Sequence, residues 1–240
     1  MRAAARRGDG ALSSTFVKRD PAPLEAAGLR WLADGGARVP RVLDERPGAL
    51  VLARVDGGSL DAAGEEELGR MLAAMHASGA PRFGSLPGRG AFFVGRCELD
   101  SPEGDDWDTY YREHRLLPLA RRVGLESEVA SVPVASPAEP PARLHGDLWT
   151  GNVLADRAGR PWLIDPAAYG GHREVDLAML ALFGRVPART LAAYDEAAPL
   201  ADGWRERVGL WQLFPLLVHA VLFGGGYLGQ TRDLARRLAR

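Results

Sequence analysis

The chain has 240 residues, of which 46% are hydrophobic and 25% charged, and its formal net charge at pH 7 is -1. This is the composition of an ordinary globular chain, long enough for one large domain or two lobes. The balanced charge offers no broad basic surface for nucleic acid. The single cysteine, Cys97, excludes an internal disulfide and a multi-cysteine zinc site.

No segment is typical of a secretory signal or a membrane span. The basic N-terminus is not followed by an apolar core. The longest apolar run, residues 210–223, contains Gln212, Pro215 and His219 and is shorter than the roughly 20 residues that a bilayer requires. We therefore expect a cytoplasmic protein with no membrane or nucleic-acid partner. We expect a monomer, and a larger assembly stays open.

The N-terminal quarter alternates short strands with one helix. Apolar spacing and turn residues predict a strand at 14–18, a helix at 24–34 and strands at 39–43 and 49–55. The first strand ends in Lys18. The small residues Gly57, Gly58 and Ser59 follow the last strand and are the first candidates for a hinge between two lobes.

The rest of the chain is mainly helical. Helical periodicity is seen around residues 65–75, at 107–122 and over most of 175–240, and proline interrupts any pattern at 131–141. Two short strands are predicted at 153–154 and 162–164. The chain is therefore predicted to be α+β, with a small strand-rich part before a larger helical part.

The segment 145–152, with the sequence HGDLWTGN, carries the strongest chemical indication. Asp147 and Asn152 stand five residues apart, which is the spacing of the kinase catalytic loop. In that loop the aspartate accepts the proton of the substrate hydroxyl, and the asparagine oxygen helps to hold Mg²⁺. Asp165 follows a predicted strand 18 residues after Asp147, where a second metal-binding aspartate is expected.

Each of these residues has a simpler interpretation when it is taken alone. Asp147 and Asn152 are both common turn residues. The ordered set of all three is much harder to obtain by chance, and it predicts a phosphotransferase.

The same segment, with residues 164–179 (IDPAAYGGHREVDLAM), resembles the fructosamine kinase (ketosamine kinase) family. The similarity extends from Phe16 to the C-terminal segments 193–200 and 222–227. The family is similar in fold to aminoglycoside phosphotransferases and choline kinases. The resemblance implies a bilobal protein-kinase-like fold, with residues 1–55 as a nucleotide-binding lobe and residues 56–240 as a catalytic and substrate-binding lobe.

The resemblance also implies roles for individual residues. Asp147 would be the catalytic base, and Asn152 and Asp165 would hold Mg²⁺. Lys18 would reach the ATP phosphates and Glu25 would be its ion-pair partner, although an edge-strand lysine and a solvated glutamate are the simpler alternative. Backbone groups of Ala53, Arg54 and Val55 would bind adenine, and the family usually has an acidic residue where this chain has Ala53.

Weaker candidates surround this set. Asp176 is expected to brace the catalytic loop, with His145 in a similar structural role. Trp149, His172 and Glu174 are candidates for the sugar site, but packing explains each of them about equally well. His76 is expected to be a packing or capping histidine.

The N-terminus departs from the family pattern. A kinase-like lobe needs two strands and a phosphate-covering loop before the lysine strand, or some 20 residues or more. Only 15 residues precede Phe16, and Gly8 and Gly10 are a weak substitute for a phosphate loop. We expect either a start site upstream of Met1 or an N-lobe that has lost this loop.

The predicted reaction is ATP- and Mg²⁺-dependent phosphorylation of a sugar hydroxyl on a ketosamine, either a small molecule or a protein-bound adduct. The resemblance implies transfer to the 3-hydroxyl, which destabilises the adduct and releases the amine. Two alternatives remain. One is a phosphotransferase for an aminoglycoside or choline-like alcohol, and the other is a catalytically poor nucleotide-binding regulatory protein.

Overall fold

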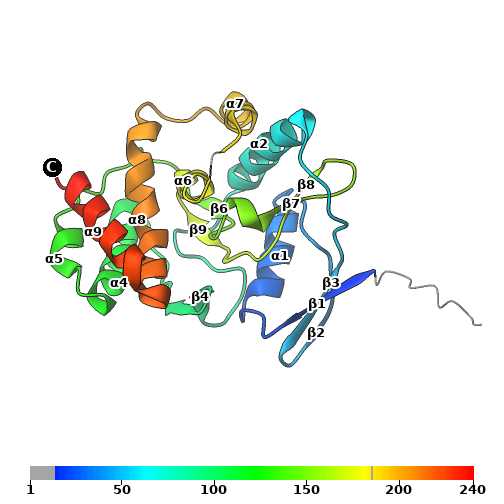
Figure 1. Cartoon of the computed structure of the whole chain (residues 1–240), viewed down its shortest axis with the longest axis horizontal. Helices are drawn as coiled ribbons and strands as arrows, with labels where there is room; N and C mark the ends of the chain where they lie inside the picture. The colour runs from blue at the N-terminus through cyan, green and yellow to red at the C-terminus, as the bar shows by residue number, and fades with distance from the viewer. Residues whose placement is uncertain (1–13, 185) are drawn as a thin grey trace, which may run out of the picture.

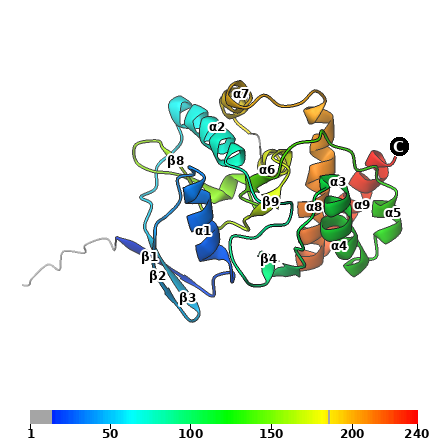
Figure 2. The same cartoon turned by 180° about the vertical axis from the view of Figure 1, so that it is seen from behind.

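A computed structural model describes residues 14–184 and 186–240. The Gly8 and Gly10 pair therefore lies outside the described residues. Figures 1 and 2 show a small sheet with one helix at one end of the molecule and a group of helices at the other. The mixed architecture confirms the predicted α+β class.

The N-terminal sheet is antiparallel and has the strand order β1-β3-β2, formed by β1 (Thr15–Arg19), β3 (Ala49–Ala53) and β2 (Val42–Arg46). Lys18 pairs with Leu50 in this sheet. The predicted strand 39–43 begins later than expected, at Val42, and a register irregularity between Val42 and Asp44 accompanies the shift. The predicted strands thus form one sheet with Lys18 on an edge strand.

Helix α1 (Glu25–Asp34) joins the sheet to the rest of the molecule. Its residues Ala26 and Leu29 pack on Leu50 and Leu52 of the sheet. Leu32 belongs to a different buried cluster, with α2 (Ala62–Ala77) and α7 (Ala188–Ala197). Figure 1 shows α2 and α7 side by side at the top of the molecule.

The helical part has the larger core, built from α3 (Trp107–Tyr110), α4 (Leu117–Arg122), α5 (Glu126–Ala130), α6 (Glu174–Leu180), α8 (Trp204–Phe223) and α9 (Gly225–Leu238). The hairpin of β4 (Phe92–Val94) and β5 (Cys97–Leu99), which the sequence analysis did not predict, covers one end. The apolar run 210–223 lies within α8, which confirms its prediction as a buried helix.

Two prolines change the predicted helices. The helix predicted at 107–122 contains a π-helical segment, Tyr111–Leu116, before Pro118. Pro118 has no N–H for the His114 carbonyl, which accepts a hydrogen bond from the Arg115 guanidinium instead (3.1 Å). In α8, Pro215 leaves the Trp211 carbonyl without its helical donor, and the Tyr111 hydroxyl donates to that oxygen at 3.1 Å.

Two short antiparallel strand pairs hold the central segment. Strand β6 (Ala142–Leu144) pairs with β9 (Tyr169–Gly171), and β7 (Val153–Ala155) pairs with β8 (Pro161–Leu163). A short 3-10 helix, Thr150–Asn152, precedes β7. The predicted strands 153–154 and 162–164 are therefore confirmed as one hairpin. The segment 145–152 leaves β6 and enters β7, so both of its ends are fixed by strands.

Among the described residues, none of the helices is both long and apolar enough to cross a membrane.

Candidate active site

The segment 145–152 is held by its backbone. Gly146 has a φ of 79°, and a Cβ at this position would lie 2.0 Å from the carbonyl oxygen of Ala167. Only glycine tolerates both the positive φ and this close approach. The adjoining Leu148 is fully buried in the cluster formed by α1, α2 and α7. Asp147 therefore lies between two residues, Gly146 and Leu148, that packing holds in place.

Asp176 braces this segment from α6, the role for which the sequence analysis named it. Its carboxylate is fully buried and accepts the backbone N–H groups of His145 (2.7 Å) and Gly146 (2.9 Å), one on each oxygen. Backbone amides that donate to a carboxylate form strong, directional bonds. The helix therefore fixes the backbone immediately before Asp147.

His145 ties the same segment to the strand that precedes Asp165. Its Nδ1 accepts the Asp147 N–H at 3.3 Å, and its Nε2 donates to the Ile164 carbonyl at 2.9 Å. Burial lowers the pKa of His145, so the imidazole stays neutral and one tautomer satisfies both bonds. His145 thus has a structural role here.

Asp147 and Asn152 are in contact. The Asn152 amide nitrogen donates to the Asp147 backbone carbonyl (2.8 Å) and to its carboxylate (3.2 Å). Burial raises the pKa of Asp147 to about 6, against the opposing hydrogen bond from Asn152, and the nearby Asp165 and Asp176 add to the rise. A carboxylate with a raised pKa is a better proton acceptor near neutral pH.

Lys18 lies between two carboxylates. Its Nζ is 2.7 Å from Glu25 Oε2 and 3.0 Å from Asp165 Oδ1. Burial alone would lower the pKa of Lys18, but the hydrogen bonds and charges of Glu25 and Asp165 outweigh it, so the pKa is raised. Glu25 is 2% exposed, unlike the solvated glutamate of the simpler alternative. Asp165 itself has a φ of 55°, an unusual backbone conformation for a non-glycine residue.

A cavity of about 220 Å³ lies beside the N-terminal sheet and has Asp165 in its wall. Ala53, Arg54 and Val55 line it, together with the apolar residues Phe16, Pro40, Leu52, Leu154 and Ile164. The amides of Ala53 and Arg54 donate to the carbonyls of Arg41 (2.9 Å) and Ser14 (3.0 Å). Of the three, only the Val55 amide has no hydrogen-bond partner within the described part of the chain.

A second cavity, of about 420 Å³, has Asp147 in its wall. Its lining includes the aromatic rings of Trp149, Phe183, His219, Phe223 and Tyr227. The rings form a chain of contacts that leads from Trp149 to Phe183 (6.1 Å between centroids) and from Phe183 to His219 (5.0 Å). Trp149 is 37% exposed, so it is not a packed core indole.

The sequence analysis missed most of this aromatic wall. His219, Phe223 and Tyr227 are spaced four residues apart, but the surrounding apolar run favours a buried helix, and the glycines at 224–226 mark a turn without showing which cavity the rings face. The spacing of the three rings was the signal available in the sequence.

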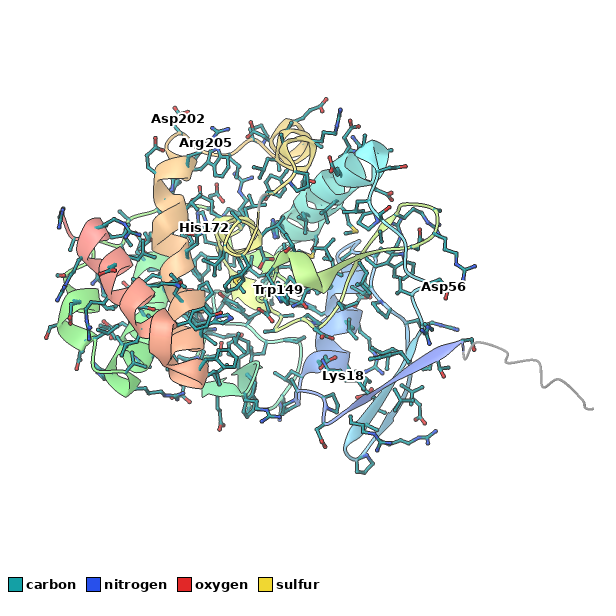
Figure 3. All side chains as sticks on the ribbon, in the orientation of Figure 1. Lys18, Asp56, Trp149, His172, Asp202 and Arg205 are labelled. Atoms are coloured by element: carbon teal, nitrogen blue, oxygen red, sulfur yellow. The ribbon has the colours of Figure 1, made fainter. Side chains whose placement is uncertain are left out.

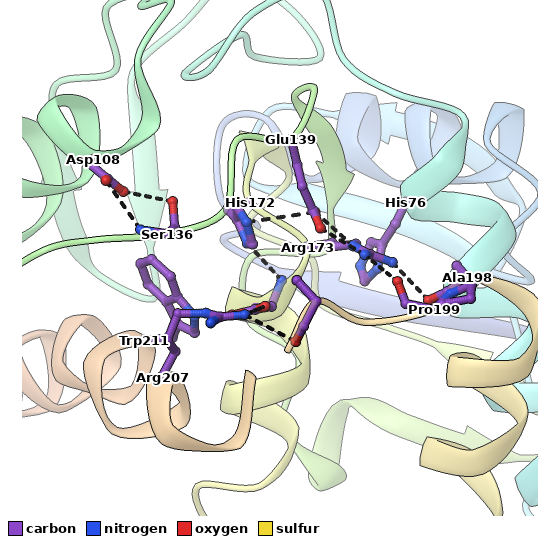
Figure 4. A network of polar contacts seen from close by, with 12 residues as sticks. His76, Asp108, Ser136, Glu139, His172, Arg173, Ala198, Pro199, Arg207 and Trp211 are labelled. Atoms are coloured by element: carbon purple, nitrogen blue, oxygen red, sulfur yellow. Dashed lines mark hydrogen bonds and ion pairs between the residues drawn. The ribbon is translucent and has the colours of Figure 1, made fainter. Parts of the chain in front are cut away.

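His172 and Glu174 do not line either cavity that carries Asp147 or Asp165. Glu174 is buried and binds Arg207 through both oxygens (2.6 and 2.9 Å) and the Trp211 indole at 2.8 Å. The His172 ring stacks on Trp211, with 5.5 Å between centroids. Figure 4 shows this network around α8, and Figure 3 shows His172 well apart from Lys18 and Trp149. The packing alternative accounts for both residues.

Oxygen atoms near Asp147 suit a magnesium ion. The Asn152 amide nitrogen is engaged by Asp147, which leaves Asn152 Oδ1 as a ligand, and Lys18 takes only Oδ1 of Asp165. Magnesium binds through one or two protein oxygens plus phosphates and water. The described residues contain no cluster of three or more His, Cys, Asp or Glu that could hold a metal ion.

The fold and these residues define a class of protein. The architecture is that of the protein-kinase-like phosphotransferases, and an aminoglycoside-3'-phosphotransferase of type VIII shares it with a TM-score of 0.55, covering 84% of each chain at 22% identity. At that identity the similarity concerns the fold alone.

Closer similarity identifies the family. The family described as fructosamine kinase matches residues 22–240. A Thermus thermophilus protein assigned as a ketoamine kinase is 40% identical over 223 residues, covering 88% of this chain and 81% of that protein. A Thermobifida fusca crystal structure assigned as a fructosamine-3-kinase has a TM-score of 0.82 at 41% identity, covering 94% and 85% of the two chains. This chain belongs to the fructosamine kinase family, which confirms the resemblance seen in its sequence.

Proposed function

We propose that this protein is an ATP-dependent kinase that phosphorylates a sugar hydroxyl of a ketosamine. The observation that carries the proposal is the position of Asp147, which lies in the wall of an open aromatic cavity and in contact with Asn152, in a chain of the fructosamine kinase family. The name of the Thermobifida relative supports transfer to the 3-hydroxyl.

ATP would bind beside the N-terminal sheet. The adenine ring would lie in the 220 Å³ cavity, where the Val55 amide is available as a donor and the flanking apolar side chains cover the ring faces. Lys18, oriented by Glu25, would hold the phosphates. We also propose that residues 1–55 act as the nucleotide lobe and residues 56–240 as the catalytic lobe.

Asn152 and Asp165 would hold Mg²⁺, which supplies positive charge that neutralises the phosphates when it is bound. Asp147 would accept a hydrogen bond from the acceptor hydroxyl, orient its oxygen and take its proton. A phosphate next to the ketone carbon of the adduct would destabilise the adduct and lead to release of the amine.

The acceptor cavity supports a cationic amine substrate. A ketosamine carries a secondary ammonium beside its sugar, and aromatic faces attract such cations. Asp147 is the one carboxylate among the described lining residues, and it is needed for the hydroxyl. The aromatic rings of the cavity are therefore the groups available to bind the ammonium. Trp149 would lie against the sugar or the amine.

The test is phosphorus NMR of products formed from ATP, Mg²⁺ and an N-alkyl ketosamine. It is run beside the isosteric ether, in which oxygen replaces the ammonium nitrogen. We expect 3-phosphorylation of the ketosamine, a lower kcat/KM for the ether, and loss of product in Asp147→Asn. Equal activity of Asp147→Asn would contradict the assigned base. A preference for an aminoglycoside or choline over the ketosamine would contradict the proposed substrate.

Binding of ATP distinguishes the proposed enzyme from a regulatory protein without activity. Thermal stabilisation by ATP and Mg²⁺ without phosphorylation of any of these alcohols would favour the regulatory alternative. Because it uses ATP, we propose that the enzyme acts in the cytoplasm on small-molecule or protein-bound ketosamines.

A further inference from the structure

A buried chain of hydrogen bonds leads from helix α7 to residues 145–152, the catalytic segment. The Tyr194 hydroxyl lies 2.8 Å from His76 Nδ1, and His76 Nε2 lies 3.2 Å from Asp176 Oδ2. Asp176 in turn binds the backbone N–H groups of His145 and Gly146. All three side chains are at most 3% exposed. Three helices, α7, α2 and α6, thus meet at the residues just before Asp147.

The protons in this chain have one consistent direction. Asp176 accepts two backbone N–H groups, so its carboxylate also accepts from His76, whose Nε2 must carry the proton. In the neutral imidazole Nδ1 is then an acceptor, and the Tyr194 hydroxyl donates to it. Burial raises the pKa of Tyr194, which keeps this proton in place.

The Tyr194 hydroxyl faces the guanidinium of Arg173 on its other side. Arg173, which begins the segment leading into α6, binds Glu139 through two hydrogen bonds of 2.7 and 2.8 Å. Its guanidinium also donates to the carbonyls of Ala198 (2.8 Å) and Pro199 (2.7 Å), just beyond the end of α7.

We propose that Tyr194 is a positioning residue that acts through His76 and Asp176 to hold the backbone of the catalytic segment. Without its hydroxyl, the buried His76 Nδ1 has no donor, so the imidazole is free to rotate or change tautomer. The bond from His76 to Asp176 then weakens, and Asp147 is less well placed for the acceptor hydroxyl. This inference rests on the proposed role of Asp147.

The first test is Tyr194→Phe with Tyr111→Phe as its matched control. Tyr111 is also fully buried and donates its hydroxyl to α8 carbonyls. It lies outside the relay, which consists of Tyr194, His76 and Asp176. We expect Tyr194→Phe to lower kcat on the order of 3- to 30-fold with unchanged KM for ATP. The control should lose stability but keep its kcat. Equal kcat in the two variants would overturn the proposal.

Replacement of His76 tests the relay itself. His76→Gln keeps an acceptor and a donor at its amide and should retain more activity than His76→Leu, which has neither. Once His76→Leu is present, adding Tyr194→Phe should lower kcat no further, because the relay is already broken. Multiplicative losses in the double variant would overturn the proposal.

Hydrogen exchange provides a readout that needs no substrate. Tyr194→Phe should speed amide exchange in the peptide that contains His145 and Gly146, whereas Tyr111→Phe should not. If the wild type phosphorylates no ketosamine but this exchange pattern is found, the proposed function fails and the relay stands. Unchanged exchange in Tyr194→Phe would overturn the relay.

Discussion

Individual side chains in this protein show how the environment sets chemical roles. Asp147 and Asp165 are both aspartates near the same cleft, but their surroundings differ. Asp147 is partly buried with a pKa of about 6, whereas Asp165 has a 43% exposed side chain beside Lys18. The first suits a proton acceptor, and the second, open to solvent and beside a cation, suits a ligand for a metal ion.

The raised pKa of Asp147 predicts the pH dependence of the reaction. We expect kcat/KM to rise with pH through about pH 6, because only the ionised carboxylate accepts the proton. Asp147→Asn should lower kcat/KM about 10²- to 10⁴-fold above pH 6, and by less below it, where the wild-type carboxyl is protonated. A pH profile of both enzymes is the measurement. A flat wild-type profile between pH 5 and 7 would contradict the assignment.

The raised pKa of Asp147 also predicts how the stability of the folded protein depends on pH. Below pH 3.8 the carboxyl is protonated in both folded and unfolded states, and above that pH the unfolded chain ionises first. The ionised group therefore destabilises the fold increasingly up to about pH 6, by at most ~3 kcal/mol. Asp147→Asn should raise the melting temperature at pH 7 but not at pH 4. A gain of equal size at both pH values would exclude this cause.

Replacement of Lys18 should lower activity and stability for two different reasons, which a second substitution can separate. Lys18→Met should lower kcat/KM about 10²-fold, because an oriented charge at the phosphates is lost. It should also destabilise the protein, because Glu25 is buried and loses its cation. In the double variant Lys18→Met/Glu25→Gln, denaturant unfolding should recover much of the stability while activity stays low. Recovery of activity would contradict the role of Lys18.

On the scale of helices and strands, the close packing of α2 against α7 positions the relay residues His76 and Tyr194. Helices α2 and α7 approach so closely that a Cβ at Gly69 would lie 2.2 Å from the Thr190 carbonyl oxygen. Thr190 also donates its hydroxyl to the Glu65 carbonyl at 2.9 Å. This contact sets the distance between His76 and Tyr194 on the same two helices.

Gly69→Ala should therefore destabilise the protein although alanine is the better helix former. We expect a loss of about 1–3 kcal/mol from the overpacked contact, measured by denaturant unfolding. The control is Gly229→Ala in α9, where a Cβ would meet nothing within 4 Å. That variant should gain about 0.5–1 kcal/mol. A neutral or stabilising Gly69→Ala would show that the helices can separate without cost.

On the scale of the whole molecule, the sheet that would bind ATP contacts the catalytic part through Lys18 and through the linker after β3. Lys18 contacts Asp165, and the linker after β3 bonds to the β7–β8 hairpin through the Gly58 amide, which donates to the Ala155 carbonyl at 2.7 Å. A Cβ at Gly58 would lie 2.1 Å from the Asp156 carbonyl oxygen. The predicted hinge is therefore pinned at Gly58.

Gly58→Ala should displace the linker and misalign the two parts. We expect a lower kcat and a higher KM for ATP, with a smaller thermal shift on adding ATP and Mg²⁺. Gly57→Ala is the matched control, since a Cβ there would meet nothing within 4 Å. Wild-type kinetics in Gly58→Ala would show that the linker position does not control the cleft.

The local pattern predicted many of the elements, although it missed the β4–β5 and β6–β9 pairs, and it indicated the candidate catalytic residues. Strand 14–18, helix 24–34 and the hairpin 153–164 follow from apolar spacing, and the set of Asp147, Asn152 and Asp165 follows from short spacings along one segment. These features depend on neighbours in the chain. The π-helical turn before Pro118 was not predicted, because apolar periodicity does not show how the chain compensates the N–H that Pro118 lacks.

Contacts between distant segments required the folded chain. The aromatic wall joins residues from the catalytic segment, the turn after α6, α8 and α9, and the relay joins Tyr194 to His76 across 118 residues. The sequence analysis expected a packing or capping role for His76 and proposed a sugar-site role for His172, and only the folded structure shows the buried partners of each. Periodicity reports which face of an element is apolar, but not which other element covers it. That choice is made by packing, because only the assembled core determines which polar groups meet inside it.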